Sequence, residues 1–204
     1  MTIFYKFEGK MYINLTNGCP CKCVFCIRDN ADSISGNDSL WLEHEPTMEE
    51  IISAFESFDK TGISEAVFCG YGEPMVRADM VVSTAEYIKA HSDMKLRLNT
   101  NGLVKLIHPD FDINRLKGLI DSVSISLNAP NAVRYNEVTR PSFGEKAFDT
   151  MLDFAEKIKG ICHTAFTVVD VISAGEIEEC RAVADKMGIP LRVRAYVTDN
   201  ESYT

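Results

Sequence analysis

Six short apolar runs alternate with helical patterns along this chain of 204 residues, and this alternation constrains the fold more than any other feature. Strands that alternate with helices favour a parallel sheet covered by helices. The predicted strands are 11–15, 65–69, 95–100, 122–128, 164–169 and 191–197. The predicted helices lie near 47–58, 77–91, 113–119, 132–138, 145–159 and 176–187.

The number of strand–helix units limits the architecture further. Six units cannot fill an eight-strand barrel, so we predict an α/β fold of the partial (β/α)6 TIM-like type, an open three-quarter barrel of parallel strands. A flat doubly wound sheet is the alternative. The chain has no linker-like stretch, repeat or low-complexity tract, so one domain is expected over residues 1–204.

Local signals mark several helix ends. Thr47 followed by Glu50 fits a capping box at the start of the first helix. Gly160 and Gly188 stand where two later helices are expected to end.

Composition narrows the classes of partner. The net charge is −9 and no Lys/Arg-rich block is present, which argues against a broad nucleic-acid surface. The first residues do not resemble a signal peptide, and no apolar run approaches membrane-spanning length. We therefore expect a cytoplasmic protein without a membrane partner.

Four of the seven cysteines fall within eight residues, in a cysteine loop that covers residues 17–26. In a reducing compartment such a concentration of thiols indicates metal or redox chemistry. Cys19-x3-Cys23-x2-Cys26 supplies three thiolates, which can hold three irons of a cubane cluster and leave the fourth iron open to a small molecule. Cys21 is then a bystander. A zinc site made by all four thiols is the alternative, although the Cys21-x-Cys23 spacing is tight and no second cysteine pair follows.

Polar and glycine-rich segments follow successive strands, where parallel α/β folds place their ligand sites. The 70–74 loop, Gly-Tyr-Gly-Glu-Pro, follows the second strand, and Asn99 to Gly102 closes the third. Ser126 and Asn128 lie two apart at the end of the fourth, so an extended chain puts them on one face. Glycine lets a backbone approach a ligand closely, although each of these segments also suits an ordinary turn.

These motifs together resemble the radical SAM superfamily. The three-cysteine motif, with Phe25 before its last cysteine, looks like the cluster loop of that family. The 70–74 loop looks like its "GGE" motif, with Tyr71 where the first glycine often stands, and Ser126 to Asn128 occupy a cofactor-contact position. More narrowly, the segments 14–17, 26–29, 40–43 and 68–74 resemble the small TatD-linked radical SAM proteins.

The resemblance implies a mechanism. Cys19, Cys23 and Cys26 would hold a [4Fe-4S] cluster whose open iron binds S-adenosylmethionine. Reductive cleavage of that cofactor would give methionine and a 5′-deoxyadenosyl radical, which abstracts hydrogen from an unidentified substrate. The implied cofactor-binding residues are Phe25, Gly70, Tyr71, Gly72, Glu73, Asn99, Ser126, Asn128 and Tyr196.

Within that set, the resemblance puts Gly72 and Glu73 near the methionine amino group. Ser126 and Asn128 are candidates for the ribose hydroxyls and the carboxylate. Backbone near Phe25 and around Tyr196 would meet the adenine, so the roles divide among several strand ends.

Two other functions stay open at this point. One is an activase that installs a glycyl radical on a partner protein, and the other is a non-catalytic iron–sulfur or zinc module. The substrate can be a small molecule or a protein, the reductant is expected to be a flavodoxin or ferredoxin, and the oligomeric state is open. Arg134, Arg192 and Arg194 can reach an anionic group or lie solvated. Cys69 and Cys162 are isolated and suit apolar packing.

Overall fold

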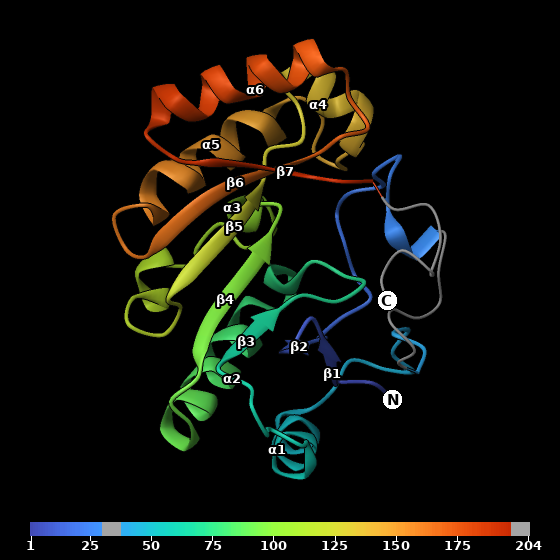
Figure 1. The fold of residues 1–204 in the computed structure, drawn as a ribbon, viewed down its shortest axis with the longest axis vertical. Helices are drawn as coiled ribbons and strands as arrows, with labels where there is room; N and C mark the ends of the chain where they lie inside the picture. The colour runs from blue at the N-terminus through green and yellow to red at the C-terminus, as the bar shows by residue number, and fades with distance from the viewer. Residues whose placement is uncertain (30–37, 197–204) are drawn as a thin grey trace.

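The structure is a computed structural model that describes residues 1–29 and 38–196. Seven strands form one sheet and follow one another across it in chain order (Figure 1). They are β1 Phe4–Phe7, β2 Lys10–Ile13, β3 Glu65–Phe68, β4 Lys95–Thr100, β5 Ser122–Ser126, β6 His163–Val169 and β7 Leu191–Arg194. The α-helices are α1 Met48–Ser57, α2 Ala78–His91, α3 Val104–Ile107, α4 Ala132–Thr139, α5 Lys146–Ile158 and α6 Ala174–Met187, and the 3-10 turns are η1 Ile27–Asp29, η2 Pro74–Arg77 and η3 Ile113–Leu116.

The strand order decides between the two predicted architectures. Strands β2 to β7 run parallel and never reverse their order, whereas a doubly wound sheet reverses at a switch point. Among the described strands, β1 and β7 do not pair with each other, so the sheet is open. The open partial barrel is therefore confirmed, and the flat doubly wound sheet is wrong.

Strand β1 was not predicted. It pairs antiparallel with β2 through a two-residue turn, in which Glu8 and Gly9 have φ of 47° and 70°. Two successive positive φ angles are typical of a type I′ hairpin turn. The hairpin extends the parallel sheet at its first edge.

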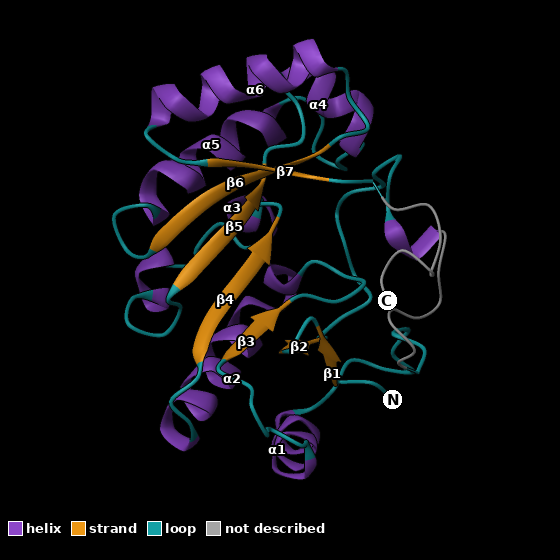
Figure 2. Ribbon diagram, viewed as in Figure 1, coloured by secondary structure: helices purple, strands orange, loops and turns teal. Residues whose placement is uncertain are grey.

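The two faces of the sheet differ in chemistry because side chains alternate along each strand. Leu96 and Leu98 point to the outer face, where they join the main apolar core with Met151 and Phe154. Figure 2 shows helices α2, α3 and α5 behind the sheet on this side. The inner face carries the polar residues that alternate with core positions, namely Arg97, Asn99, Ser124, Ser126 and Thr167. Because the helices of the described ranges pack on the other side, this polar face leaves room for a polar ligand.

The predicted helix ends are mostly correct. The Glu50 N–H donates to Thr47 Oγ1 at 3.3 Å and Thr47 N–H donates to Glu50 Oε2 at 2.8 Å, which confirms the capping box. Gly188 ends α6 in the left-handed conformation, as predicted. Helix α5 ends at Ile158 with Lys159 as its C-cap, so Gly160 directly follows the helix end as predicted, but it does not adopt a left-handed φ.

Three predicted boundaries differ from the structure. The strand predicted over 122–128 ends at Ser126, because Asn128 has a left-handed φ of 53° and leaves the extended chain. Strand β7 ends at Arg194, and residue 197 of the predicted strand lies outside the described residues. The helix predicted over 113–119 is the short 3-10 turn η3. No helix in the described ranges is both long and apolar enough to cross a membrane.

Candidate active site

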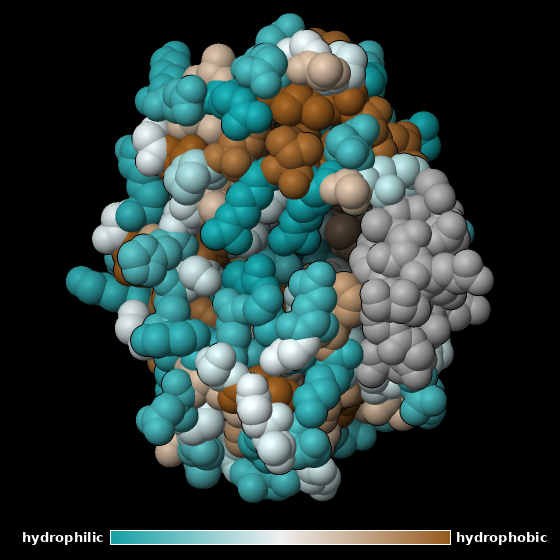
Figure 3. All heavy atoms as spheres, viewed as in Figure 1, coloured by the Kyte–Doolittle hydropathy of each residue, from teal (hydrophilic) through white to brown (hydrophobic). Residues whose placement is uncertain are grey.

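A cavity of about 210 Å³ lies at the carboxyl ends of the strands, between the cysteine loop and the inner face. Its described lining residues are Cys19, Cys21, Cys23, Phe25, Cys69, Tyr71, Gly72, Glu73, Pro74, Asn99, Thr100, Asn101, Ser126, Asn128, Tyr135, Thr139 and Arg194. The space-filling view shows a recess near the middle of this face, among hydrophilic side chains (Figure 3). Most of the predicted site residues thus share one cavity.

Three predicted site residues lie outside that lining. Cys26 is half-buried just beyond Phe25, in a turn where its N–H donates to Cys23 O at 3.1 Å. Gly70 packs beneath the cavity against Asn14, and a Cβ there would meet the Asn14 side chain. Tyr196 lies past the end of β7, where its N–H donates to Asp170 Oδ1 at 2.6 Å. Sequence position alone did not distinguish these residues from those that reach the cavity.

Helix α4 holds the cysteine loop in place. Lys22 N–H donates to Thr139 O at 3.0 Å, and Val24 N–H donates to Val138 O at 2.9 Å. Both acceptors belong to the last turn of α4, whose carbonyls lack partners within the helix. Figure 1 shows the loop beside α4, although more than 100 residues separate them in the chain. The sequence indicated α4 only as a small insert, whereas the structure makes it the support of the loop.

The thiols within the loop differ in their surroundings. Cys21 is the most buried, with 3% of its surface exposed, and Asn101 Nδ2 lies 3.8 Å from its sulfur. Cys19 and Cys23 are half-buried and lie within hydrogen-bond reach of the Cys21 thiol. The hydrogen bond to Cys19, then that to Cys23, raises the pKa of Cys21, and the same bond lowers the pKa of Cys19. The pKa of the Cys21 thiol is therefore raised while that of Cys19 is lowered, which favours the thiolate at Cys19 over that at Cys21.

The donor set suits an iron–sulfur cluster, since thiolates are the ligands that such clusters take. Cys19 and Cys23 face the cavity from one side, and the polar ends of β3, β4 and β5 face it from the other. Among the residues that the structure describes, no three Cys, His, Asp or Glu side chains converge as a single metal ion requires. A cubane spaces its thiolates more widely than one ion does, so that finding concerns a single ion only.

Gly72 allows the 70–74 loop to contact the cysteine loop. A Cβ at this position would meet the backbone oxygen of Thr16 and lie 2.6 Å from that of Gly18. The neighbouring Glu73 N–H donates to Gly18 O at 2.9 Å. We predicted that glycine here lets the backbone approach a ligand, but the chain that comes close is the cysteine loop. Glycine is required because two backbones meet.

Glu73 is a buried structural junction. Its Oε1 accepts hydrogen bonds from Thr100 Oγ1 at 2.6 Å and Met75 N–H at 3.1 Å, and its Oε2 accepts from Asn101 N–H at 2.7 Å. Burial raises the pKa of the Glu73 carboxyl, and these hydrogen bonds oppose that shift. Glu73 thus caps the 3-10 turn η2, and its side chain also joins the ends of β3 and β4.

Cys69 and Arg194 also line the cavity, although neither was among the predicted cofactor-binding residues. Cys69, which was expected only to pack, lies in the lining beside Asn99, and burial raises the pKa of its thiol while a hydrogen bond from Asn99 lowers it. Arg194 reaches the cavity from the end of β7. The Asn99 Oδ1 atom is buried and has no hydrogen-bond partner among the described residues. An acceptor with no partner, facing a cavity, indicates a place for a ligand donor.

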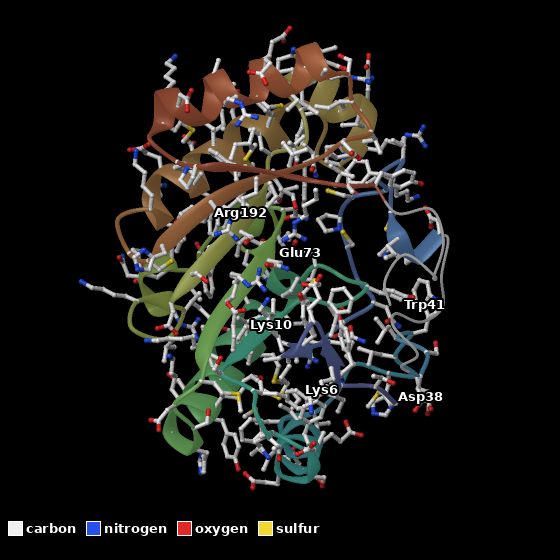
Figure 4. All side chains as sticks on the ribbon, viewed as in Figure 1. Lys6, Lys10, Asp38, Trp41, Glu73 and Arg192 are labelled. Carbon is white, nitrogen blue, oxygen red and sulfur yellow. The ribbon has the colours of Figure 1, made fainter. Side chains whose placement is uncertain are left out.

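The separate segments that suggested the narrower resemblance contact one another. Asn14 Nδ2 donates to Leu40 O at 2.7 Å, and Asn17 exchanges two hydrogen bonds with the backbone of Leu42. The Trp41 ring packs edge-on against Tyr71 of the 70–74 loop, with centroids 5.1 Å apart. Trp41 is labelled beside the inner face in Figure 4. These segments pack together beside β2, and among them only residues of the 68–74 segment line the cavity.

This geometry defines a class of protein, namely an open α/β barrel with a cysteine loop and a polar cavity at the carboxyl ends of its strands. The family model of the Radical SAM superfamily matches residues 13–183, which is most of the chain. The protein therefore belongs to the radical SAM superfamily, whose members are enzymes that use a [4Fe-4S] cluster and S-adenosylmethionine. The match spans every strand from the end of β2 to β6.

Curated relatives and a solved structure agree with this family. The chain is 30% identical over 131 residues to a GTP 3′,8-cyclase of Lactiplantibacillus plantarum, covering 63% of this chain and 36% of the relative. It is 27% identical over 159 residues to molybdenum cofactor biosynthesis protein 1 of Dictyostelium discoideum, covering 78% and 24%. The dual-specificity RNA methyltransferase RlmN of Halorhodospira halophila is 28% identical over 137 residues, covering 64% and 35%.

Among solved structures, histidine-tagged anSMEcpe with bound AdoMet superposes with a TM-score of 0.67 at 17% identity, over 91% of this chain and 49% of that one. At this identity the likeness supports the fold alone. The chain spans about a quarter to two-fifths of the length of these curated relatives, whose named reactions differ from one another.

Proposed function

We propose that this protein is a radical S-adenosylmethionine enzyme that acts on a substrate still to be identified. The observation that carries the proposal is the shared cavity, in which the cysteine loop faces polar groups from three successive strand ends. A redox cluster beside a small polar cavity suits binding and cleavage of a cofactor. A purely structural metal site has no need of the cavity.

Cys19, Cys23 and Cys26 are the proposed cluster ligands, and Cys21 is the proposed non-ligand. When bound, the cluster and the cofactor supply a reductive cleavage that yields methionine and a 5′-deoxyadenosyl radical for hydrogen abstraction. Cys21 is instead buried and accepts a hydrogen bond from Asn101 Nδ2 at 3.8 Å, which suits a positioning role. Helix α4 keeps the loop over the cavity.

The polar strand ends are the proposed cofactor contacts. Asn99 offers an unpartnered buried oxygen, while Ser126 and Asn128 line the cavity from the end of β5. Glu73 and Gly72 hold the 70–74 loop against the cysteine loop, so their part in cofactor binding is to shape the cavity. We propose that Phe25 and Tyr71, which line the cavity, contact the cofactor. Gly70 and Tyr196 lie outside the lining, and we propose that only the backbone near them contacts the cofactor.

We also propose membership of the TatD-linked subgroup, because three of the segments of that resemblance contact one another and the 70–74 loop. The proposed electron donor is a flavodoxin or ferredoxin, and the proposed location is the cytoplasm, where thiols stay reduced. This proposal predicts a TatD-type gene beside the gene for this protein, and the absence of such a gene there would argue against the subgroup.

Anaerobic reconstitution tests the main proposal. Purified protein is loaded with iron and sulfide, assayed for both and for zinc, then reduced with dithionite in the presence of S-adenosylmethionine. We expect a cluster and the formation of 5′-deoxyadenosine. Bound zinc without labile sulfide would support the structural module instead, and a radical signal that appears only with a large protein partner would support the activase. A reduced cluster that yields no 5′-deoxyadenosine would reject the enzyme.

A further inference from the structure

We propose that Arg192 and Arg194 form an anion-binding subsite on the β7 side of the cavity, which takes a phosphate or carboxylate group of the substrate. This inference rests on the proposed function, because it treats the adjoining cavity as the place of the cofactor. It adds a chemical class of substrate that neither the fold nor the cysteine loop specifies.

The strand register places the subsite beside the cavity. Ser126 of β5 pairs with Thr167 of β6, and Thr167 pairs with Arg192 of β7, so the three side chains share the inner face in one row. Arg194 lies two residues further along β7, opposite Val169, and therefore points to the same face. Figure 4 labels Arg192 at β7 and Glu73 below it, on the same side of the sheet.

The Arg194 charge is directed into the barrel. Its side chain lines the cavity together with Cys69 and Asn99, which come from strands on the opposite side. Burial dominates the pKa of Cys69 and raises it, but the Arg194 charge is one of the influences that lower it. The same charge acts on Tyr12 of β2, where it also opposes the effect of burial on the pKa. Arg194 is exposed as a whole, so it lines the cavity on a side that is open to solvent.

Two other cations on the inner face, Arg97 and Lys10, share the carboxylate of Glu65. Arg97 Nε lies 3.3 Å from Glu65 Oε1, and Lys10 Nζ lies 3.8 Å from Glu65 Oε2. Arg134, which sequence considerations placed in the same group as Arg192 and Arg194, pairs with Glu176 at 2.6 Å and Glu137 at 2.9 Å. Because Arg134 already forms these ion pairs, it is not part of the proposed anion-binding subsite.

Arg192 and Arg194 are not neutralised in this way. Within residues 1–29 and 38–196 neither side chain forms an ion pair or a hydrogen bond. Asp170, the acidic residue that follows β6, uses its carboxylate on the Tyr196 N–H. Two adjacent unpaired guanidinium groups in a protein of net charge −9 form a local positive site. Guanidinium binds carboxylate and phosphate through paired N–H donors, and the Ser126 hydroxyl lies in the same row.

The test uses inorganic phosphate as the probe and the reconstituted enzyme with saturating S-adenosylmethionine. Equilibrium dialysis with differently labelled phosphate and cofactor follows both ligands in one sample. We expect saturable phosphate uptake by the wild type, and at least about tenfold weaker uptake by the Arg192→Gln/Arg194→Gln double variant. The loss of phosphate affinity in this variant must be larger than any change in its affinity for S-adenosylmethionine. Arg181→Gln is the matched control, because that arginine pairs with Glu178 on the surface of α6.

A second variant and a second anion make the result decisive. The Arg192→Lys/Arg194→Lys double variant keeps both charges but loses the paired donors, so we expect an intermediate phosphate affinity. Acetate is used as a competitor. If acetate displaces phosphate at concentrations similar to that of phosphate, the subsite accepts a carboxylate as readily as a phosphate. If acetate competes only weakly, the subsite prefers phosphate. Circular dichroism of each variant shows whether it is folded.

Three outcomes would overturn the subsite. They are no phosphate uptake by the wild type, a folded glutamine variant that binds phosphate within twofold of the wild type, and displacement of the cofactor by phosphate. The last would assign the arginines to the cofactor carboxylate. Formation of 5′-deoxyadenosine is measured in the same wild-type preparation, so its absence rejects the proposed function separately.

Discussion

The carboxylate of Glu73 accepts a 2.7 Å hydrogen bond from the Asn101 backbone N–H, and Asn101 in turn places its Nδ2 atom 3.8 Å from the Cys21 sulfur. A single chain of polar contacts therefore runs from the 70–74 loop, through the end of β4, to the centre of the cysteine loop. Glu73 N–H also binds Gly18 O, which closes this chain into a ring. These contacts hold in place the loop that carries the proposed cluster ligands.

Glu73→Gln tests whether this residue is structural. The amide would put a donor where both carboxylate oxygens now accept hydrogen bonds, so at least one buried N–H or O–H loses its partner. We expect a loss of about 1–3 kcal/mol in the free energy of unfolding of the cluster-free protein, measured by urea denaturation. Glu86→Gln, at an exposed position on α2, should have no measurable effect. An unchanged stability with weaker cofactor binding would make Glu73 a ligand contact instead.

Gly72→Ala tests the close approach of the two loops. The added methyl group would collide with backbone oxygens of Thr16 and Gly18, which cannot turn away as a side chain could. We expect destabilisation of about 2 kcal/mol or more and a marked fall in the iron and sulfide taken up during reconstitution. Gly175→Ala in α6 is the matched control, since the nearest atom lies 4.0 Å away and alanine favours a helix. Equal iron uptake by both variants would contradict the explanation.

Cys21→Ala tests whether the buried Cys21 thiol differs in its role from the three proposed cluster ligands. Because Cys21 is buried and packs beside Asn101, we expect a loss of stability of about 1–2 kcal/mol with retention of the cluster. Cys26→Ala should instead abolish cluster binding at little cost in the stability of the cluster-free protein. Iron and sulfide assays with the visible absorption spectrum measure both. A cluster that survives in the Cys26 variant and disappears in the Cys21 variant would reverse the assignment.

Asp121→Asn should show a defined pH dependence. Burial raises the pKa of Asp121, but hydrogen bonds from Lys89 and the Leu96 N–H outweigh that effect and leave the pKa lowered. A carboxylate with a lowered pKa stabilises the fold above its unfolded pKa of about 3.9, and this contribution disappears as the pH falls through the folded pKa.

We therefore expect Asp121→Asn to cost about 1 kcal/mol at pH 7, and the difference from the wild type to shrink below about pH 4. Urea denaturation at a series of pH values measures it. Asp110→Asn, at an exposed position without a described partner, serves as the control. A difference that stays constant down to about pH 2 would show that charge is not the cause.

The sequence by itself determined the α/β class with a parallel sheet and the character of the site. Alternating strands and helices are local patterns of hydrophobicity, and six of them leave an open parallel barrel as the economical arrangement. The spacing of Cys19, Cys23 and Cys26 is likewise a local property, as is the capping box at Thr47. Such features are readable because neighbouring residues produce them.

Only the tertiary structure decided which residues meet. The support of the cysteine loop by α4, the approach of Gly72 to the Thr16 backbone, and the position of Arg194 in the cavity all join segments that lie far apart in the chain. The same holds for the β1 hairpin, whose residues carry no distinctive pattern until β2 is there to pair with them. These relationships depend on strand register and on side-chain direction, which are set when the whole sheet packs and not by any short stretch of sequence.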